Sequence, residues 1–124
     1  MTLTVSNESA LPIYRQLYDQ ISHAILRGEL HSADALPTIR TVASELRISV
    51  IGVKRAWEEL ERDGYIVTAV GRGSFVAALD ETALREKRLR LLRERMEEYL
   101  RCAKSVGASE EELALIAEES TLPR

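Results

Sequence analysis

The stretch VGRGSFVA, residues 70–77, sets two glycines around a lone arginine and then returns at once to apolar, β-prone residues. Glycine has no Cβ and adopts positive φ angles freely, which suits a tight turn. Residues 74–77 therefore read as one strand, and YIVT, residues 65–68, reads as its partner. The pattern predicts a β-hairpin with Arg72 at its tip. That tip is either a simple turn or one that approaches another surface closely.

Three helical patterns precede the hairpin. Apolar residues recur at helical spacing after Pro12 and predict an amphipathic helix over residues 13–27 that ends at Gly28. Thr38 can cap a shorter second helix that runs to about Leu46. The inner faces predicted for these two helices are Ile13, Leu17, Ile21, Ala24 and Ile25, then Val42, Ala43 and Leu46.

Ser49 can cap a third helix that runs to about Asp63, where Gly64 stops it. Its predicted inner face is Val53, Ala56, Trp57 and Leu60, and Trp57 is expected to pack this helix onto the first one. At the amino terminus, residues 2–5 alternate as a short strand does.

After the hairpin, Asp80 can cap a long helix over residues 81–105, which Gly107 ends. Its apolar stripe advances in steps of 3, 4, 3, 4 and 3 residues, which is coiled-coil spacing. Ser109 and Glu112 have the form of a capping box that opens a last short helix. The stripe consists of Leu89, Leu92, Met96, Tyr99, Ala103 and Val106.

This order predicts a mainly α (α+β) fold, a winged helix-turn-helix domain over residues 1–78 followed by a long and a short helix over residues 79–124. In such a domain the third helix enters the DNA major groove, and the hairpin reaches along the backbone or into the minor groove. Glycines at the tip would permit close approach, and Arg72 could enter a narrow, electronegative groove.

Composition sets looser bounds. The 124 residues carry 17 Lys and Arg against 20 Asp and Glu, a net charge of −3, so a DNA-binding surface would have to be a local basic patch. Cys102 is the lone cysteine, which excludes an intrachain disulfide. Neither a secretory leader nor a membrane-spanning run is recognisable, and we therefore expect a cytoplasmic protein without a membrane partner.

Five short motifs resemble the winged-helix domain of GntR-family transcription regulators. They cover about residues 11–78 in the family's order and spacing. The motifs are PIYxQL (residues 12–17), ILRGEL (25–30), LPTxR (36–40), AWxxLExDGYI (56–66) and GxGSFV (71–76). The short tail, with a long helix before GASEEELALI (107–116), is similar to that of the YtrA-type subfamily. The resemblance implies that the two terminal helices dimerise the protein, and because many members of the subfamily are repressors, we expect a repressor.

The chain departs from the family pattern in two places. Ser32 and Ala33 replace the usual Pro-Gly pair, which predicts a less rigid loop. The third helix begins with Val50, Ile51 and Gly52, where the family carries polar residues and a threonine. Aliphatic side chains can touch thymine methyl groups but cannot form the bidentate contacts that distinguish guanine. This predicts base readout shifted toward DNA shape and the wing.

Several residues are expected to contact DNA. Arg40 lies in the first turn of the second helix, where a cation is unfavourable unless an external anion accepts it. Arg47 and Arg55 are expected to be surface charges, and the aromatic residues to belong to the core. The predicted DNA-binding set is Thr38, Arg40, Ser49, Lys54, Gly71, Arg72 and Gly73.

The stripe on the long helix is the predicted dimer interface, because so small a domain offers that helix too little surface to cover it. A two-fold dimer fits a palindromic operator. An effector, if one exists, would bind at the dimer interface or between it and the wing domain. The alternative from another class is a winged-helix protein-interaction module, whose apolar contact would use Val50, Ile51 and Gly52.

An enzyme finds little support. The sequence offers no nucleophile paired with a base and no phosphate-binding loop. His23 and His31 have unsuitable spacing for a metal site, and the glutamates of the long helix are typical of a solvated face. We therefore expect no catalytic residue, no metal and no cofactor.

Overall fold

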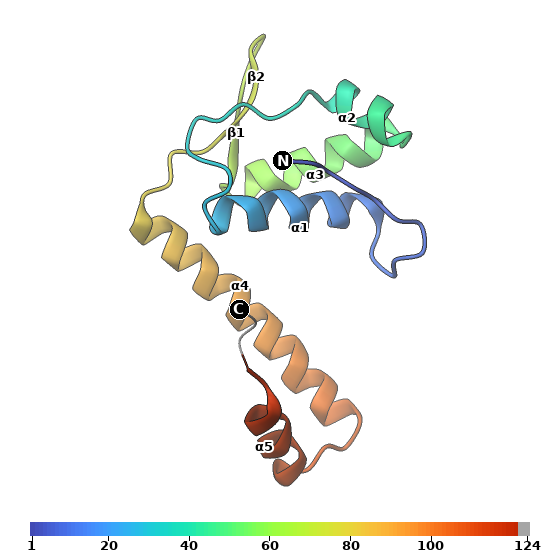
Figure 1. The fold of residues 1–124 in the computed structure, drawn as a ribbon, viewed down its shortest axis with the longest axis vertical. Helices are drawn as coiled ribbons and strands as arrows, with labels where there is room; N and C mark the ends of the chain where they lie inside the picture. Colours follow the sequence, from blue (N-terminus) through green and yellow to red (C-terminus); the bar gives the residue numbers. More distant parts are fainter. Residues whose placement is uncertain (122–124) are drawn as a thin grey trace. The chain divides into compact units, whose positions relative to one another are not determined.

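The computed structural model describes residues 1–121, in two compact units, residues 1–84 and a unit that begins at Arg85. The fold is mostly helical with a small two-stranded wing, as predicted (Figure 1). The elements are α1 (Ile13–Leu26), α2 (Ile39–Leu46), α3 (Val50–Arg62), β1 (Ile66–Ala69), β2 (Gly73–Val76), α4 (Glu81–Ser105) and α5 (Glu110–Glu119).

The core of the first unit lies between α1, α2 and α3. Helix α3 packs against both of the other helices (Figure 1). The predicted inner faces are confirmed, apart from Ile13 and Leu46, which are half-buried. The buried residues of these helices include Leu17, Ile21, Ala24, Ile25, Val42, Ala43, Val53, Ala56, Trp57 and Leu60.

Local capping fixes where the helices begin. The Thr38 hydroxyl accepts a hydrogen bond from the Thr41 amide at 3.0 Å, and the Ser49 hydroxyl accepts one from the Gly52 amide at 3.1 Å. Each bond satisfies an amide that has no partner within its own helix. Between these helices Arg47 has a φ of +56°, and this left-handed residue makes the tight turn of the helix-turn-helix.

The amino-terminal segment is not the strand predicted over residues 2–5. It runs along α1, where two glutamine side chains take up its backbone hydrogen bonds. Gln20 donates to the Thr4 carbonyl and accepts from the Thr4 amide, and Gln16 does the same for Ser6. Side-chain amides thus supply the pairing that a neighbouring strand would otherwise provide.

The wing is held to the body of the unit by the loop before α2. Strands β1 and β2 are antiparallel, with Val67 opposite Phe75. Compared with the prediction, β1 lies one residue later in the sequence and β2 lies one residue earlier. On the other edge of β2, the Leu36 amide donates to the Ser74 carbonyl and the Val76 amide donates to the Asp34 carbonyl, both at 2.9 Å. Only the tip of the hairpin therefore extends beyond this third segment.

Tyr18 joins α1 to the end of α3. Its hydroxyl donates a hydrogen bond to the Asp63 carboxylate, and its ring meets Tyr65 edge to face. Burial, followed by the hydrogen bond to Asp63, raises the pKa of the Tyr18 hydroxyl above its usual value. Because Asp63 follows the last turn of α3, where an acid is unfavourable, this hydrogen bond offsets part of the repulsion from the helix dipole.

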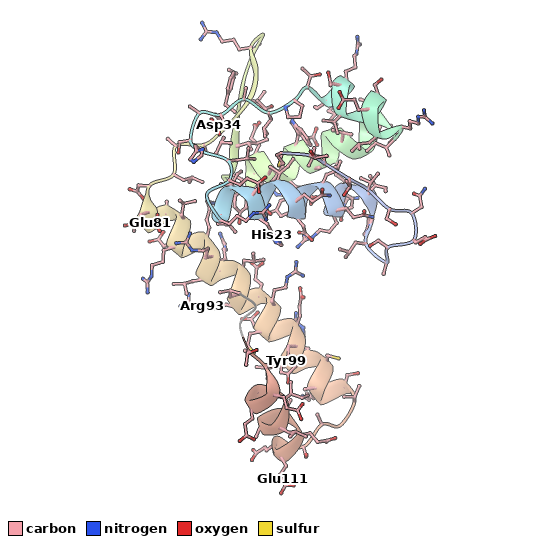
Figure 2. The ribbon with its side chains drawn as sticks, viewed as in Figure 1. His23, Asp34, Glu81, Arg93, Tyr99 and Glu111 are labelled. Atoms are coloured by element: carbon pink, nitrogen blue, oxygen red, sulfur yellow. The ribbon has the colours of Figure 1, made fainter. Side chains whose placement is uncertain are left out.

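In the second unit, α4 ends at a left-handed Gly107, with φ +67°, and α5 opens with the predicted capping box. Ser109 and Glu112 exchange hydrogen bonds, and the bond from the Ser109 amide lowers the pKa of the Glu112 carboxyl. Figure 2 shows Arg93 and Tyr99 along α4 and Glu111 on α5. Neither helix contains a buried residue within this single chain.

Candidate nucleic-acid interface

The wing tip is a reverse turn that only glycine accommodates well. Gly71 and Gly73 have φ angles of +76° and +109°, and the Arg72 amide donates to the Ala69 carbonyl at 2.9 Å. A Cβ at either glycine would meet open space, so the backbone angles alone require glycine. The central residues of this turn are Val70, which is fully exposed, and Gly71, and Arg72 follows them as an exposed residue of the tip.

A groove lies between the wing and the start of α2. Its volume is about 530 Å³, and it is lined by residues 35–39, Trp57 and residues 68–75. Thr38, Gly71, Arg72 and Gly73 share this groove, so the structure brings four of the predicted DNA-binding residues together. Arg40, Ser49 and Lys54 are outside its lining.

The remaining predicted residues surround the starts of α2 and α3. Arg40 is exposed in the first turn of α2, and Ser49 is the exposed N-cap of α3. Lys54 is 64% exposed and lies 3.9 Å from Glu58, one turn further along. The first turns of α2 and α3, both within the described part of the chain, contain no acidic residue. The positive end of each helix dipole is thus left for an external anion.

Arg55 has a role that the sequence analysis missed. Its guanidinium lies over the Tyr14 ring, 3.7 Å from the centroid, and its Nε is 4.0 Å from the Glu59 carboxylate. The contact with Tyr14 joins α3 to α1, whereas the contact with Glu59 lies within α3, and the Arg55 side chain stays 58% exposed. The sequence alone does not indicate the contact between Arg55 and Tyr14, because that contact depends on how α1 packs on α3.

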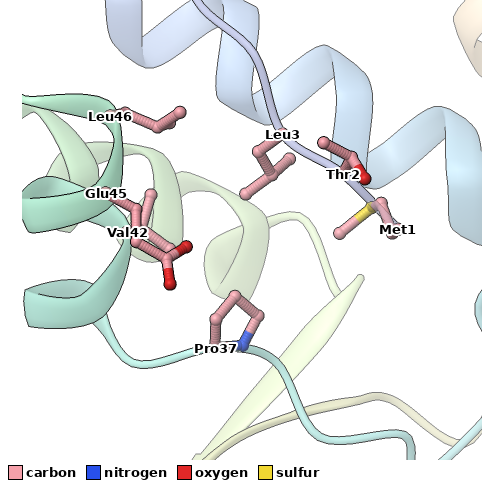
Figure 3. Close-up of a pocket in the computed structure, with 7 residues that line it drawn as sticks. All are labelled: Met1, Thr2, Leu3, Pro37, Val42, Glu45 and Leu46. Carbon is pink, nitrogen blue, oxygen red and sulfur yellow. The ribbon is translucent and has the colours of Figure 1, made fainter.

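A second pocket, of about 320 Å³, lies where the amino-terminal segment passes α2. Met1, Thr2 and Leu3 form one side, and Val42, Glu45 and Leu46 form the other (Figure 3). Its lining surface is about equally polar and apolar. Within residues 1–121, no three His, Cys, Asp or Glu side chains gather as a metal site.

The first turn of α3 contains a glycine that the fold does not need. The φ of Gly52 is not positive, and a Cβ there would meet only the Ser49 hydroxyl, at 3.4 Å. Helical glycine is less stable than alanine by about 0.5–1 kcal/mol. We expect Gly52→Ala to raise the free energy of unfolding by up to that amount, measured by urea denaturation.

Gly73→Ala is the matched control for that substitution. Its φ of +109° strains any residue with a Cβ, so this variant is expected to lower the free energy of unfolding. A Gly52→Ala protein that is less stable than wild type would mean that the start of α3 has less room than the geometry indicates.

The predicted dimer stripe is largely uncovered in the single chain. Leu92, Met96 and Val106 are 63%, 56% and 74% exposed, Tyr99 is also exposed, and Leu89 and Ala103 are half-buried. Outside this stripe, Leu100 on α4 and Leu115 and Ile116 on α5 are exposed as well. No helix within residues 1–121 has the length and apolarity to cross a membrane.

Comparison with known proteins identifies relatives over most of the chain. The profile of the family "Bacterial regulatory proteins, gntR family" matches residues 13–76. The uncharacterized HTH-type transcriptional regulator YhcF of Bacillus subtilis is 34% identical over 106 residues, which are 86% of this chain and 87% of YhcF. The HTH-type transcriptional repressor YtrA of the same organism is 30% identical over 111 residues, 90% of this chain and 85% of YtrA.

Solved structures show the same fold. A transcriptional antiterminator from Listeria monocytogenes EGD-e superposes with a TM-score of 0.74 at 29% identity, covering 96% of this chain and 89% of that one. The structure of AraR(DBD) in complex with operator ORX1 superposes with a TM-score of 0.53 at 27% identity, covering 60% of this chain and 93% of that one.

Proposed function

Because the chain belongs to the GntR family of bacterial regulatory proteins, we propose that it is a dimeric repressor that binds a palindromic operator in duplex DNA. The family and the relatives are DNA-binding transcription regulators, and none of those compared is an enzyme. The observation that carries the proposal is the joint exposure of Arg72 at the wing tip and of Arg40 and Lys54 around two helix starts that lack acids.

Each proposed DNA contact has a physical reason. Arg40 and Lys54 would hold phosphates beside the positive ends of α2 and α3, together with the capping hydroxyls of Thr38 and Ser49. Arg72 would enter the minor groove, and the backbone at Gly71 and Gly73 would lie close to the sugar–phosphate chain. Phosphate contacts position the protein, while α3 and the wing read the sequence.

The proposed dimer forms through α4. The stripe of Leu89, Leu92, Met96, Tyr99, Ala103 and Val106 keeps coiled-coil spacing on a helix without buried residues, so a second copy of α4 is its simplest cover. A two-fold pair then presents two reading heads, which matches an operator made of two inverted half-sites.

Salt dependence of binding tests this proposal. An operator is first obtained by selecting from a random duplex library with the purified full chain. Arg40, Lys54 and Arg72 from both protomers give six phosphate-neutralising cations, and each releases about 0.9 counterion. The logarithm of the association constant is therefore expected to fall against the logarithm of salt concentration with a slope of about −5.

Two results of these experiments would contradict the proposed operator binding. A library that yields no enriched sequence, or binding that does not weaken with salt, would overturn the proposal. The exposed pair Val50 and Ile51 favours a second candidate, a protein-interaction module. That candidate predicts no salt-dependent retention on duplex DNA.

A further inference from the structure

The start of α3 exposes two aliphatic side chains that the fold leaves uncovered. Ile51 is 80% exposed and Val50 is 49% exposed, whereas Val53, further along the same helix, is fully buried. These side chains add little to the stability of the fold, because hydrophobic stabilisation comes from apolar surface that folding removes from water. Their burial is therefore expected to come from a binding partner.

The surroundings of Ile51 indicate what kind of partner that is. Residues three positions apart share one face of a helix, so Ile51 and Lys54 line the outer side of α3, while the Arg55 guanidinium lies over the Tyr14 ring of α1. Both basic side chains are more than half exposed. An aliphatic group with the exposed Lys54 one turn away, at a helix start without acids, is complementary to a surface that is anionic at its edges and apolar within.

Gly52 points to a close approach at the same place. Neither its φ angle nor the space around it requires glycine, and alanine would make the helix more stable. Because glycine has no side chain, the first turn of α3 protrudes less next to Ile51 than it would with any other residue at position 52. A partner surface can then come nearer to the backbone than a side chain at residue 52 would allow.

Resting on the proposed function, we propose that Ile51, assisted by Val50, packs against the 5-methyl groups of thymines in the DNA major groove. The thymine methyl is the apolar feature of that groove, and its edges are rows of phosphates. Side chains at positions 50–52 have no hydrogen-bond donors, so this turn does not recognise guanine by a bidentate contact. The contacted half-site positions are therefore T·A pairs.

Uracil scanning of the selected operator tests this inference. Replacing one thymine by deoxyuridine removes the 5-methyl group and leaves every hydrogen-bonding group of the base in place. A methyl buried against Ile51 is worth about fourfold in affinity, so wild-type binding is expected to weaken about fourfold at the contacted thymines and to stay unchanged elsewhere. Affinities are measured by fluorescence anisotropy with the full chain.

The variant Ile51→Ala assigns the effect to one side chain. It is expected to weaken binding to the thymine operator and to bind thymine and uracil operators with equal affinity at the contacted positions. Leu11→Ala is the matched control, because Leu11 is an exposed aliphatic residue, 46% exposed, ahead of α1. This control is expected to keep the full fourfold uracil effect.

Two results would overturn the inference while leaving the proposed function intact. In the first, wild type binds a selected operator but no uracil position lowers its affinity. In the second, Ile51→Ala retains the fourfold uracil effect, which would assign methyl contact to another residue. Folding of the variant is checked by its melting temperature, which is expected to match wild type because Ile51 is largely exposed.

Discussion

Replacing Arg72 by alanine is expected to weaken operator binding by about tenfold to a hundredfold without changing the melting temperature. The loss corresponds to about 1–3 kcal/mol, the range typical of a well-placed arginine contact to DNA. Stability is expected to be unaffected because Arg72 lies exposed in a turn whose shape depends on the flanking glycines. Gel-shift titration gives the affinity, and circular dichroism on heating gives the melting temperature.

Arg27→Ala is the matched control for this experiment. Arg27 is also an exposed arginine of the first unit, 61% exposed and paired with Glu29, but it lies at the end of α1, outside the turn that we propose contacts DNA. Its loss is expected to leave operator affinity unchanged. Arg72→Lys is expected to bind between wild type and Arg72→Ala, because lysine keeps the charge and loses the planar fork.

Arg40→Ala is expected to reduce affinity in the same assay, because it removes the proposed phosphate contact beside the start of α2. Wild-type affinity in both Arg40→Ala and Arg72→Ala would show that the DNA-binding surface has been assigned to the wrong face of the unit.

Met96→Arg is expected to prevent the proposed dimer from forming, so that the protein sediments as a monomer, and to lower operator affinity at least a hundredfold. In a paired α4 the new guanidinium would be buried without a partner, which is strongly destabilising. The remaining monomer would bind one half-site and lose the gain from simultaneous engagement of two. Sedimentation velocity measures the mass, and gel shift measures the affinity.

Glu97→Arg is the control for this second prediction. Glu97 is the next residue of α4, it is exposed, and it lies outside the stripe, so the same arginine is expected to leave the dimer intact. Circular dichroism should show equal helix content in both variants, since Met96 is already 56% exposed in the single chain. A Met96→Arg protein that sediments like wild type would place the dimer interface elsewhere.

The helices could be predicted closely because their ends are fixed locally. Thr38, Ser49 and Ser109 each cap an amide a few residues away, and the structure confirms all three caps. The long helix begins and ends at the predicted residues, Glu81 and Ser105. Neighbouring residues alone determine these features, so they are visible in a single sequence.

Features that depend on distant residues could not be predicted. Strand β1 begins one residue later than predicted, at Ile66, and the Tyr65 amide instead donates to the Leu60 carbonyl in the turn after α3. The amino-terminal segment is paired by Gln16 and Gln20 rather than by a strand. The pairing of Arg55 with Tyr14 likewise needs the packing of α1 on α3.

The candidate site was predicted residue by residue but not as an arrangement. The sequence indicated Arg72 and its glycines by turn chemistry, and Arg40 by its unfavourable place at a helix start. The groove that joins Thr38 to the wing tip depends on backbone bonds from residues 33–36 to β2, which leave no mark on side-chain periodicity. The DNA-contact roles of these residues stay predictions.

The backbone hydrogen bonds between β2 and the loop before α2 affect how much conformational entropy the wing would lose when it binds DNA. An isolated two-stranded hairpin is only marginally ordered in water, but here the Leu36 and Val76 amides are tied into a three-segment edge and should exchange their hydrogens slowly. Ordering one backbone residue costs about 1–2 kcal/mol. On binding, only the few residues of the tip would pay this cost. Most of the favourable free energy of a contact between Arg72 and DNA would therefore contribute to the net binding free energy.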